Sequence, residues 1–122
     1  MQTLLSQKPI TVIRPLDHLN AATAGEFAQQ LTTAISGAEV VGVLVDVGGV
    51  TFIDSAGLMA LISGLKQAKK IGRRFSICSV SAGIRMILEL SQLDRVFEIF
   101  ENVESYELAN SGYPTVVEVA NL

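Results

Sequence analysis

The 122-residue sequence contains no tryptophan, one cysteine and one histidine. A single cysteine cannot form an intramolecular disulfide, so the chain is not a disulfide-stapled scaffold. Because Cys78 stands within an apolar run, we expect it to be a small buried core residue. With His18 as the only histidine, zinc sites built from three histidines or from clustered cysteines are excluded. We therefore expect no metal and no cofactor.

Basic residues are also few, and the formal net charge is −3. Only the segment 69–74 brings several of them together, whereas nucleic-acid binding needs a basic face that neutralises phosphates. We therefore expect no direct nucleic-acid partner. The longest apolar run, 40–45, is too short to cross a bilayer, and the N-terminal segment does not have the pattern of a signal peptide. These features predict a cytoplasmic protein that does not bind membranes.

The apolar residues alternate between patterns typical of strands and of helices. Strands are expected at 10–14, 40–47, 75–80 and 96–100, with a short extra strand at 3–5. The run 40–47 is rich in valine and leucine and shows little alternation, which is typical of a parallel strand buried on both faces. Four amphipathic helices are expected between about 20 and 37, 54 and 72, 81 and 93, and 103 and 110.

This order of elements predicts an α/β fold with a mostly parallel, mixed sheet of four to five strands and about four helices. We expect one domain over residues 1–122, with its core at about 10–110. Residues 113–122 form a C-terminal extension, and the pattern leaves open whether it is a further strand or a mobile segment. For the first helix, Asn20 and Thr23 are both candidate N-caps.

The strongest candidate for a functional site is the run Asp54-Ser55-Ala56-Gly57, where an apolar segment meets the second helix. The carboxyl ends of parallel strands are where α/β proteins usually bind ligands. Free N–H groups and a partial positive charge at a helix start favour an anion on Ser55, whereas Asp54 opposes one. Met59 lies one turn further along the helix and extends the same surface.

The same run also fits a purely structural role or a catalytic one. Aspartate and serine are common N-cap residues, and Gly57 can be required simply for close packing of the helix on the sheet. A catalytic triad of Ser55, His18 and Asp54 is the enzymatic alternative. It is weakly supported, because a nucleophile elbow needs glycine two residues before the serine and residue 53 is isoleucine. A nucleotide sensor would need a stacking aromatic, and Phe52 is more typical of a core residue.

The whole pattern, over about residues 10–109, resembles the STAS domain, the fold of bacterial anti-sigma factor antagonists. The resemblance is carried by the run 19–24, Leu-Asn-Ala-Ala-Thr-Ala, and more specifically by the run 52–58, Phe-Ile-Asp-Ser-Ala-Gly-Leu. The family usually has aspartate after the leucine of the first run. Here Asn20 takes that place, and asparagine can still cap a helix.

The resemblance implies a phospho-switch without enzymatic activity of its own. Unphosphorylated protein would bind an anti-sigma factor that is itself a serine kinase and so free a sigma factor. Phosphorylation at Ser55 would break the complex, and a PP2C-type phosphatase would restore it. The chain would be a monomer or a weak dimer. The expected partner-binding residues lie at the starts of the first and second helices: Asn20, Thr23, Asp54, Ser55, Ala56, Gly57, Met59 and Ser63.

The resemblance leaves two alternatives for the function. One is a STAS module in a partner-switching pathway that does not control a sigma factor. The other is a STAS protein that senses a nucleotide or another small molecule.

Overall fold

A computed structural model describes residues 10–37, 41–109 and 116–118. Their main sheet has five strands in the order β6-β5-β3-β1-β7, and each neighbouring pair is parallel. The strands are β1 (Ile10–Ile13), β3 (Gly42–Asp46), β5 (Arg74–Cys78), β6 (Glu98–Phe100) and β7 (Val116–Glu118). The expected α/β fold with a parallel sheet is confirmed. Of the two alternatives for the C-terminal extension, residues 116–118 form the strand.

A second, two-stranded parallel sheet is the part of the fold that sequence reasoning missed. It pairs β2 (Asp17–Leu19) with β4 (Val50–Ile53), and the register between them is irregular near Asp17. The segment before Asp54 therefore belongs to this small sheet rather than to the main one. The strand expected at 3–5 lies outside the described residues.

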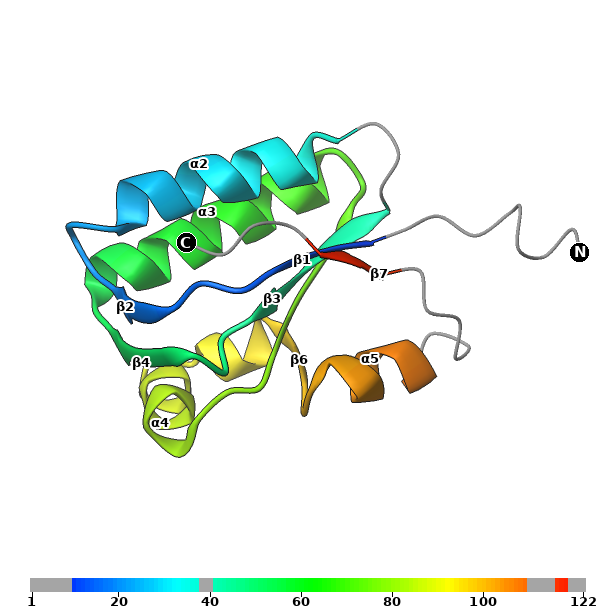
Figure 1. Cartoon of the computed structure of the whole chain (residues 1–122). Helices are drawn as coiled ribbons and strands as arrows, with labels where there is room; N and C mark the ends of the chain where they lie inside the picture. The colour runs from blue at the N-terminus through cyan, green and yellow to red at the C-terminus, as the bar shows by residue number, and fades with distance from the viewer. Residues whose placement is uncertain (1–9, 38–40, 110–115, 119–122) are drawn as a thin grey trace, which may run out of the picture.

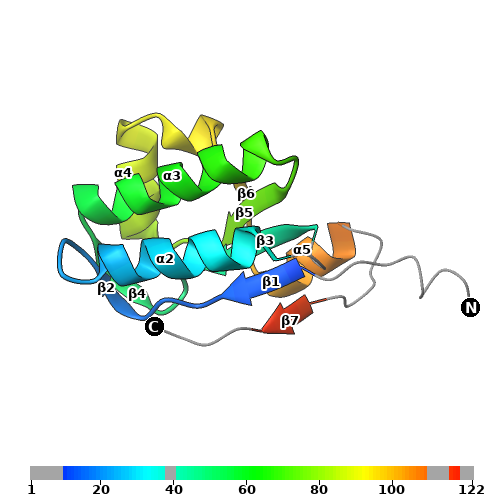
Figure 2. The ribbon, with the colours of Figure 1, turned by 90° about the horizontal axis from the view of Figure 1, so that it is seen from above.

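The helices are α2 (Ala24–Ile35), α3 (Ser55–Lys70), α4 (Ala82–Leu90) and α5 (Val103–Ala109), with a short 3-10 helix, η1 (Leu93–Arg95). In Figures 1 and 2, α2 and α3 lie side by side over one face of the main sheet. The helix expected to run from 81 to 93 ends earlier, at Leu90. Gln92 adopts a left-handed conformation with a φ of 62°, which cannot continue an α-helix.

Alternate residues of the central strands enter two different cores, as expected for strands buried on both faces. Val43 and Val45 of β3 point into the larger core beneath α2, α3 and α4, whereas Leu44 points to the other side. There it meets a smaller core that contains Cys78 and Tyr106 of α5. Cys78 is fully buried, which confirms the sequence-based expectation.

The same side of the sheet carries a polar cluster, the Arg74 cluster, formed by Arg74, Ser76, Glu98, Phe100 and Tyr106. The guanidinium of Arg74 donates to both carboxylate oxygens of Glu98, at 2.7 and 2.6 Å. The Ser76 hydroxyl donates to the same carboxylate. The guanidinium also lies over the rings of Tyr106 and Phe100, at 5.1 and 5.7 Å from their centroids. These contacts tie β5, β6 and α5 together.

Candidate partner-binding site at the start of helix α3

Asp54 caps the N-terminus of α3. Its backbone is extended, with φ −113° and ψ −171°, and its Oδ1 accepts hydrogen bonds from the N–H groups of Ala56 and Gly57, at 2.9 and 3.1 Å. The backbone carbonyl of Asp54 accepts the N–H of Leu58 and starts the helical ladder. The N-cap role of Asp54 is therefore confirmed.

The other carboxylate oxygen of Asp54 reaches a different part of the chain. Oδ2 accepts the N–H of Ala21 at 3.3 Å, and the backbone N–H of Asp54 donates to the carbonyl of Leu19 at 3.1 Å. Ala21 belongs to residues 20–23, which connect β2 to α2 and are called the β2–α2 turn below. Asp54 therefore joins this turn to the start of α3.

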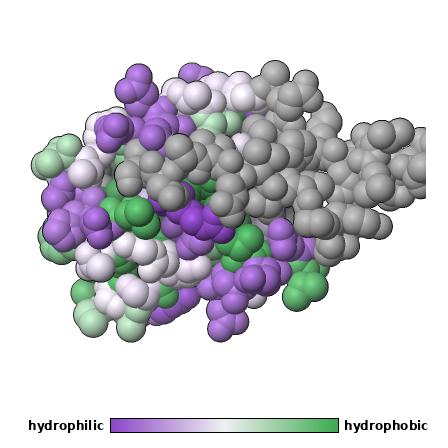
Figure 3. Space-filling view, viewed as in Figure 1, coloured by the Kyte–Doolittle hydropathy of each residue, from purple (hydrophilic) through white to green (hydrophobic). Residues whose placement is uncertain are grey.

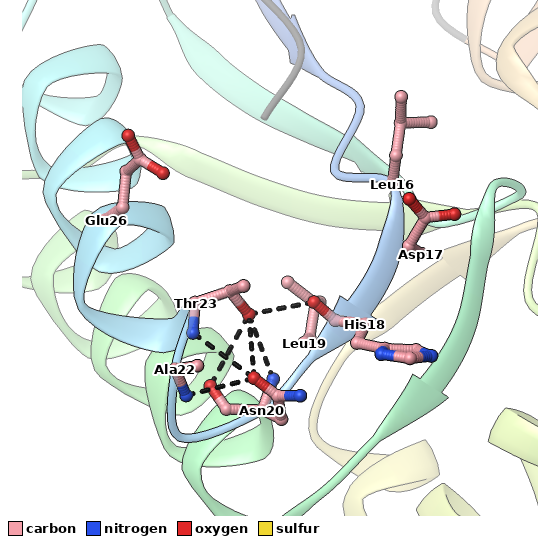
Figure 4. A pocket seen from close by; sticks show the side chains of 8 residues that line it. All are labelled: Leu16, Asp17, His18, Leu19, Asn20, Ala22, Thr23 and Glu26. Atoms are coloured by element: carbon pink, nitrogen blue, oxygen red, sulfur yellow. Dashed lines mark hydrogen bonds between the residues drawn. The ribbon is translucent and has the colours of Figure 1, made fainter.

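The β2–α2 turn is held in shape by its own side chains (Figure 4). The Asn20 Oδ1 accepts the N–H groups of Ala22 and Thr23, at 3.0 and 3.2 Å. The Thr23 Oγ1 accepts the N–H of Asn20 at 3.0 Å and donates to the carbonyl of His18 at 2.8 Å. Thr23 occupies the N-cap position of α2, yet its side chain forms no capping bond. Of the two predicted N-cap candidates, Thr23 is the N-cap residue of α2, but the side chains of Asn20 and Thr23 close the preceding turn instead of forming a capping bond to α2.

Gly57 is buried beneath the first turn of α3. A Cβ at this position would lie 2.4 Å from the carbonyl oxygen of Leu19 and 2.8 Å from Cγ1 of Ile53. Only glycine lets the helix approach β2 this closely. The assignment of Gly57 to the partner surface is therefore corrected: Gly57 supports that surface from below and is not part of it.

The exposed side of α3 carries Ser55, Met59 and Ser63 at successive turns, as the helical spacing predicts. Met59 is 56% exposed. Ala56 and Asp54 are half-buried beside them. None of the described residues forms a hydrogen bond with the hydroxyl of Ser55, which is the first residue of α3. The side chains of this stripe are open to contact from outside.

Phe52 was expected in the core and is instead 51% exposed. In β4, Val50 and Ile53 are buried, whereas Thr51 and Phe52 are exposed, so burial does not alternate along this strand. The ring of Phe52 packs edge-on against His18, with 5.9 Å between centroids. Across the described part of the face shown in Figure 3, apolar and hydrophilic residues are interspersed, so no single large apolar patch dominates it.

The residues of the hypothetical triad are not linked to one another. Among the described residues, no hydrogen bond joins Ser55, His18 and Asp54. The Asp54 carboxylate is engaged with backbone N–H groups instead.

The same hydrogen bonds reduce the number of N–H groups that the helix start can offer to an anion. Two N–H groups of the first turn, those of Ala56 and Gly57, already have an acceptor.

A depression of about 270 Å³ lies between β2 and the start of α2, next to the β2–α2 turn (Figure 4). Asn20 and Thr23 line it and were among the predicted site residues, whereas Asp17 and Glu26 were not. These two acidic residues carry no recognisable motif, so sequence reasoning had no signal for them. The eight lining residues are Leu16, Asp17, His18, Leu19, Asn20, Ala22, Thr23 and Glu26.

Two features are absent from the described part of the chain. Over residues 10–37, 41–109 and 116–118, no helix is long and apolar enough to span a membrane. Within the same ranges, no group of three or more histidine, cysteine or acidic side chains is arranged to hold a metal ion.

Comparison with known families assigns the chain to one of them. The family model described as the STAS domain matches residues 3–106. The chain belongs to the STAS domain family. This confirms the resemblance that the runs 19–24 and 52–58 indicated.

Relatives of the chain include proteins described as anti-sigma factor antagonists. An anti-sigma F factor antagonist from Paenibacillus polymyxa is 22% identical over 93 residues, which cover 76% of this chain and 80% of the relative. A putative anti-sigma factor antagonist from Thermotoga maritima has a similar structure, with a TM-score of 0.73 and 21% identity over 86% of this chain and 92% of that one. A STAS domain protein from Planctomyces limnophilus reaches 0.69 with 28% identity, over 76% and 80% of the two chains.

The same fold occurs in proteins with different descriptions. The Bacillus cell fate determinant SpoIIAA in its phosphorylated form matches with a TM-score of 0.64 and 19% identity, over 83% of this chain and 90% of that one. A sulfate transporter family protein from Wolinella succinogenes matches with 0.69 and 16% identity, over 89% and 92%. At these identities the likeness concerns the fold alone.

Proposed function

We propose that this protein is an anti-sigma factor antagonist that acts as a phospho-switch at Ser55. Its unphosphorylated form binds a serine-kinase anti-sigma factor and frees a sigma factor, and phosphorylation of Ser55 ends the binding. The observation that carries the proposal is the exposed Ser55 hydroxyl, which has no hydrogen-bond partner among the described residues and starts a well-capped helix. The family and the description of its antagonist relatives support it.

The surroundings of Ser55 explain why a phosphate there would weaken binding. A phosphate adds about −1.5 to −2 charges at neutral pH. The N–H groups of Ala56 and Gly57 are already bonded to Asp54, whose own charge lies one residue away. Because Ser55 lies on the exposed side of α3, the new charge would face the partner even where the phosphate competes with Asp54 for these N–H groups. Burying it against a surface that fits a neutral hydroxyl costs several kcal/mol, and each ~1.4 kcal/mol weakens binding tenfold.

In this proposal the chain is the substrate of an enzyme and is not itself one. The kinase transfers the γ-phosphoryl group of ATP to Oγ of Ser55, ADP leaves, and the hydroxyl proton is released. A PP2C-type phosphatase hydrolyses the ester and restores the serine. The chain works in the cytoplasm as a monomer or a weak dimer.

The exposed stripe of α3 supplies a matched experiment, because Ser63 stands two turns beyond Ser55 on the same helix. The purified chain is mixed with a candidate kinase and ATP, and intact mass and complex formation are measured. We expect wild type and Ser63→Ala to gain one phosphate and Ser55→Ala to gain none. Binding of Ser55→Asp should be at least about tenfold weaker, whereas Ser63→Asp should bind nearly as well as wild type. Phosphorylation of Ser55→Ala, or full binding of Ser55→Asp, would contradict the proposal.

A small-molecule sensor is the second candidate, and the exposed Phe52 favours it. A ring that is 51% exposed beside His18 is available to stack on a nucleotide base. Titration of the chain with nucleotides, followed by NMR, distinguishes this candidate from the first. Binding by wild type that is lost in Phe52→Ala would support a sensor, and unchanged spectra would exclude one for the nucleotides tested.

A further inference from the structure

We propose that Asp54 is a positioning residue that transmits the phosphorylation state of Ser55 to the β2–α2 turn. The inference rests on the phosphorylation of Ser55 proposed above and extends it. The partner would then meet two changed surfaces, the phosphate itself and a displaced turn at residues 20–23.

The hydrogen bonds of a single carboxylate carry this inference. Oδ1 of Asp54 holds the N–H groups of Ala56 and Gly57, and Oδ2 holds the N–H of Ala21, which is 33 residues away in the chain. One side chain thus connects the residues that follow the phosphorylation site with a turn of another segment. Any rotation of the carboxylate changes both ends of this connection.

A phosphate on Ser55 disturbs the connection in two ways. Its oxygens compete with Oδ1 for the N–H groups of the first helical turn, because phosphates bind readily at helix N-termini. Its negative charge also repels the Asp54 carboxylate, which lies on the adjacent residue. Both effects push the carboxylate away from its position in the unmodified chain.

The bond to Ala21 is the weakest of the three. At 3.3 Å it is longer than the bonds of 2.9 and 3.1 Å to the helix, and it is exposed to solvent. We therefore expect it to break first. The hydrogen bonds that Asn20 accepts from the N–H groups of Ala22 and Thr23 do not involve Asp54, so the β2–α2 turn keeps its internal shape and shifts as a unit. Because Asn20 and Thr23 line the depression beside the turn, its outline changes as well.

The test compares full-length chains that carry phosphoserine, inserted during synthesis, at position 55 or at position 63. Backbone amide chemical shifts are measured by ¹H–¹⁵N NMR. Phosphoserine at 55 should shift the Ala21 amide strongly, and phosphoserine at 63 should leave it unchanged. In Asp54→Asn the amide oxygen can still cap the helix, but the NH2 group that replaces Oδ2 cannot accept the Ala21 N–H, so the shift at Ala21 should fall by at least half. Ser55 and Ala56 should still shift in that variant.

A second variant keeps the test decisive if Asp54→Asn does not fold. In Asp54→Ser the hydroxyl can still cap α3 but has no second oxygen for Ala21. Phosphoserine at 55 should then have no effect on the Ala21 amide. An unshifted Ala21 in the wild-type chain, or an equal shift in wild type and the Asp54 variants, would overturn the inference. Since the phosphate is installed without a kinase, this outcome is independent of whether a kinase recognises Ser55.

Discussion

The start of α3 and the face of the main sheet that carries the Arg74 cluster both have polar side chains. The two regions differ in what those side chains contact. In the Arg74 cluster, Glu98 is bonded by Arg74 and Ser76, and the guanidinium lies over two rings. The polar groups there contact one another. At the start of α3, Asp54 is fully engaged with backbone N–H groups, whereas Ser55 beside it is exposed and contacts no described polar group.

This difference separates a structural cluster from the proposed phosphorylation site. Breaking a contact in the Arg74 cluster leaves a polar group without its partner, so a change there affects stability. Changing the Ser55 hydroxyl removes no internal contact, so the effect should appear in binding instead. Both effects can be measured, and three changes, taken from the largest expected effect to the smallest, test the comparison.

The largest effect on stability is expected at Gly57, which allows the N-terminal end of α3 to pack closely on β2. In Gly57→Ala the new Cβ would lie 2.4 Å from the backbone oxygen of Leu19, and a backbone atom cannot rotate away. We expect the free energy of unfolding to fall by about 3 kcal/mol, the upper range for overpacked sites. Urea denaturation measures this loss.

Gly83 of α4 provides the matched control, because a Cβ there would meet nothing within 4 Å. In Gly83→Ala we expect stability to be unchanged or to rise by up to about 1 kcal/mol, as alanine favours the helix. Equal stability of the two variants would contradict the close approach of α3 to β2.

The fold was more predictable than the site. The long run at 40–47 and the stripe of α3 predicted their elements because burial imposes a period on the sequence. The pair β2–β4 gave no such signal, since β2 has only three residues and two of them are exposed. Its absence from the prediction led to one error, because Phe52 was expected in the core and is exposed.

Within the site, Ser55 and Met59 were predictable because helical spacing alone places them on one face. The role of Gly57 was not predictable, because glycine fits both an exposed ligand loop and a close contact between a helix and a strand. The bond from Asp54 to Ala21 joins residues 33 positions apart. Only the paired strands β2 and β4 bring them together, so no local pattern could reveal it.

A smaller effect is expected at Glu98 in the Arg74 cluster. The hydrogen bond from Arg74 lowers the pKa of Glu98 below its ordinary value of 4.5, and the bond from Ser76 lowers it further, although burial opposes both. The folded state therefore gains stability from Glu98 above about pH 4.5, and loses it as the pH falls through the lowered pKa. The side chains of Arg74 and Glu98 are 38% and 42% exposed, so solvent screens their interaction. We therefore expect this gain to be about 1 kcal/mol or less.

The variant Glu98→Gln tests this dependence by urea denaturation near neutral pH and at roughly pH 3. Its loss of stability should be greater near neutral pH and should shrink at low pH, where the wild-type carboxyl takes up a proton. Glu89 on α4 is exposed and forms no ion pair with the described residues, so Glu89→Gln should show little change at either pH. A loss in Glu98→Gln that is the same at both pH values would show that charge has no part in it.

The smallest effect is expected at Cys78, whose thiol should not react with a reagent in the native protein. Cys78 is buried, whereas Ser55 is exposed. Burial raises the pKa of the Cys78 thiol to about 11, and the side chain is inaccessible in the folded chain. Since only the thiolate reacts, roughly one molecule in a thousand would be reactive at pH 8 even if reagent could enter. We expect iodoacetamide to leave native wild type unlabelled and to label the urea-unfolded chain fully. In Ser55→Cys the native chain should take up one label at residue 55. Labelling of native wild type, or a protected thiol in Ser55→Cys, would contradict the assignment of these two positions to the inside and the outside of the protein.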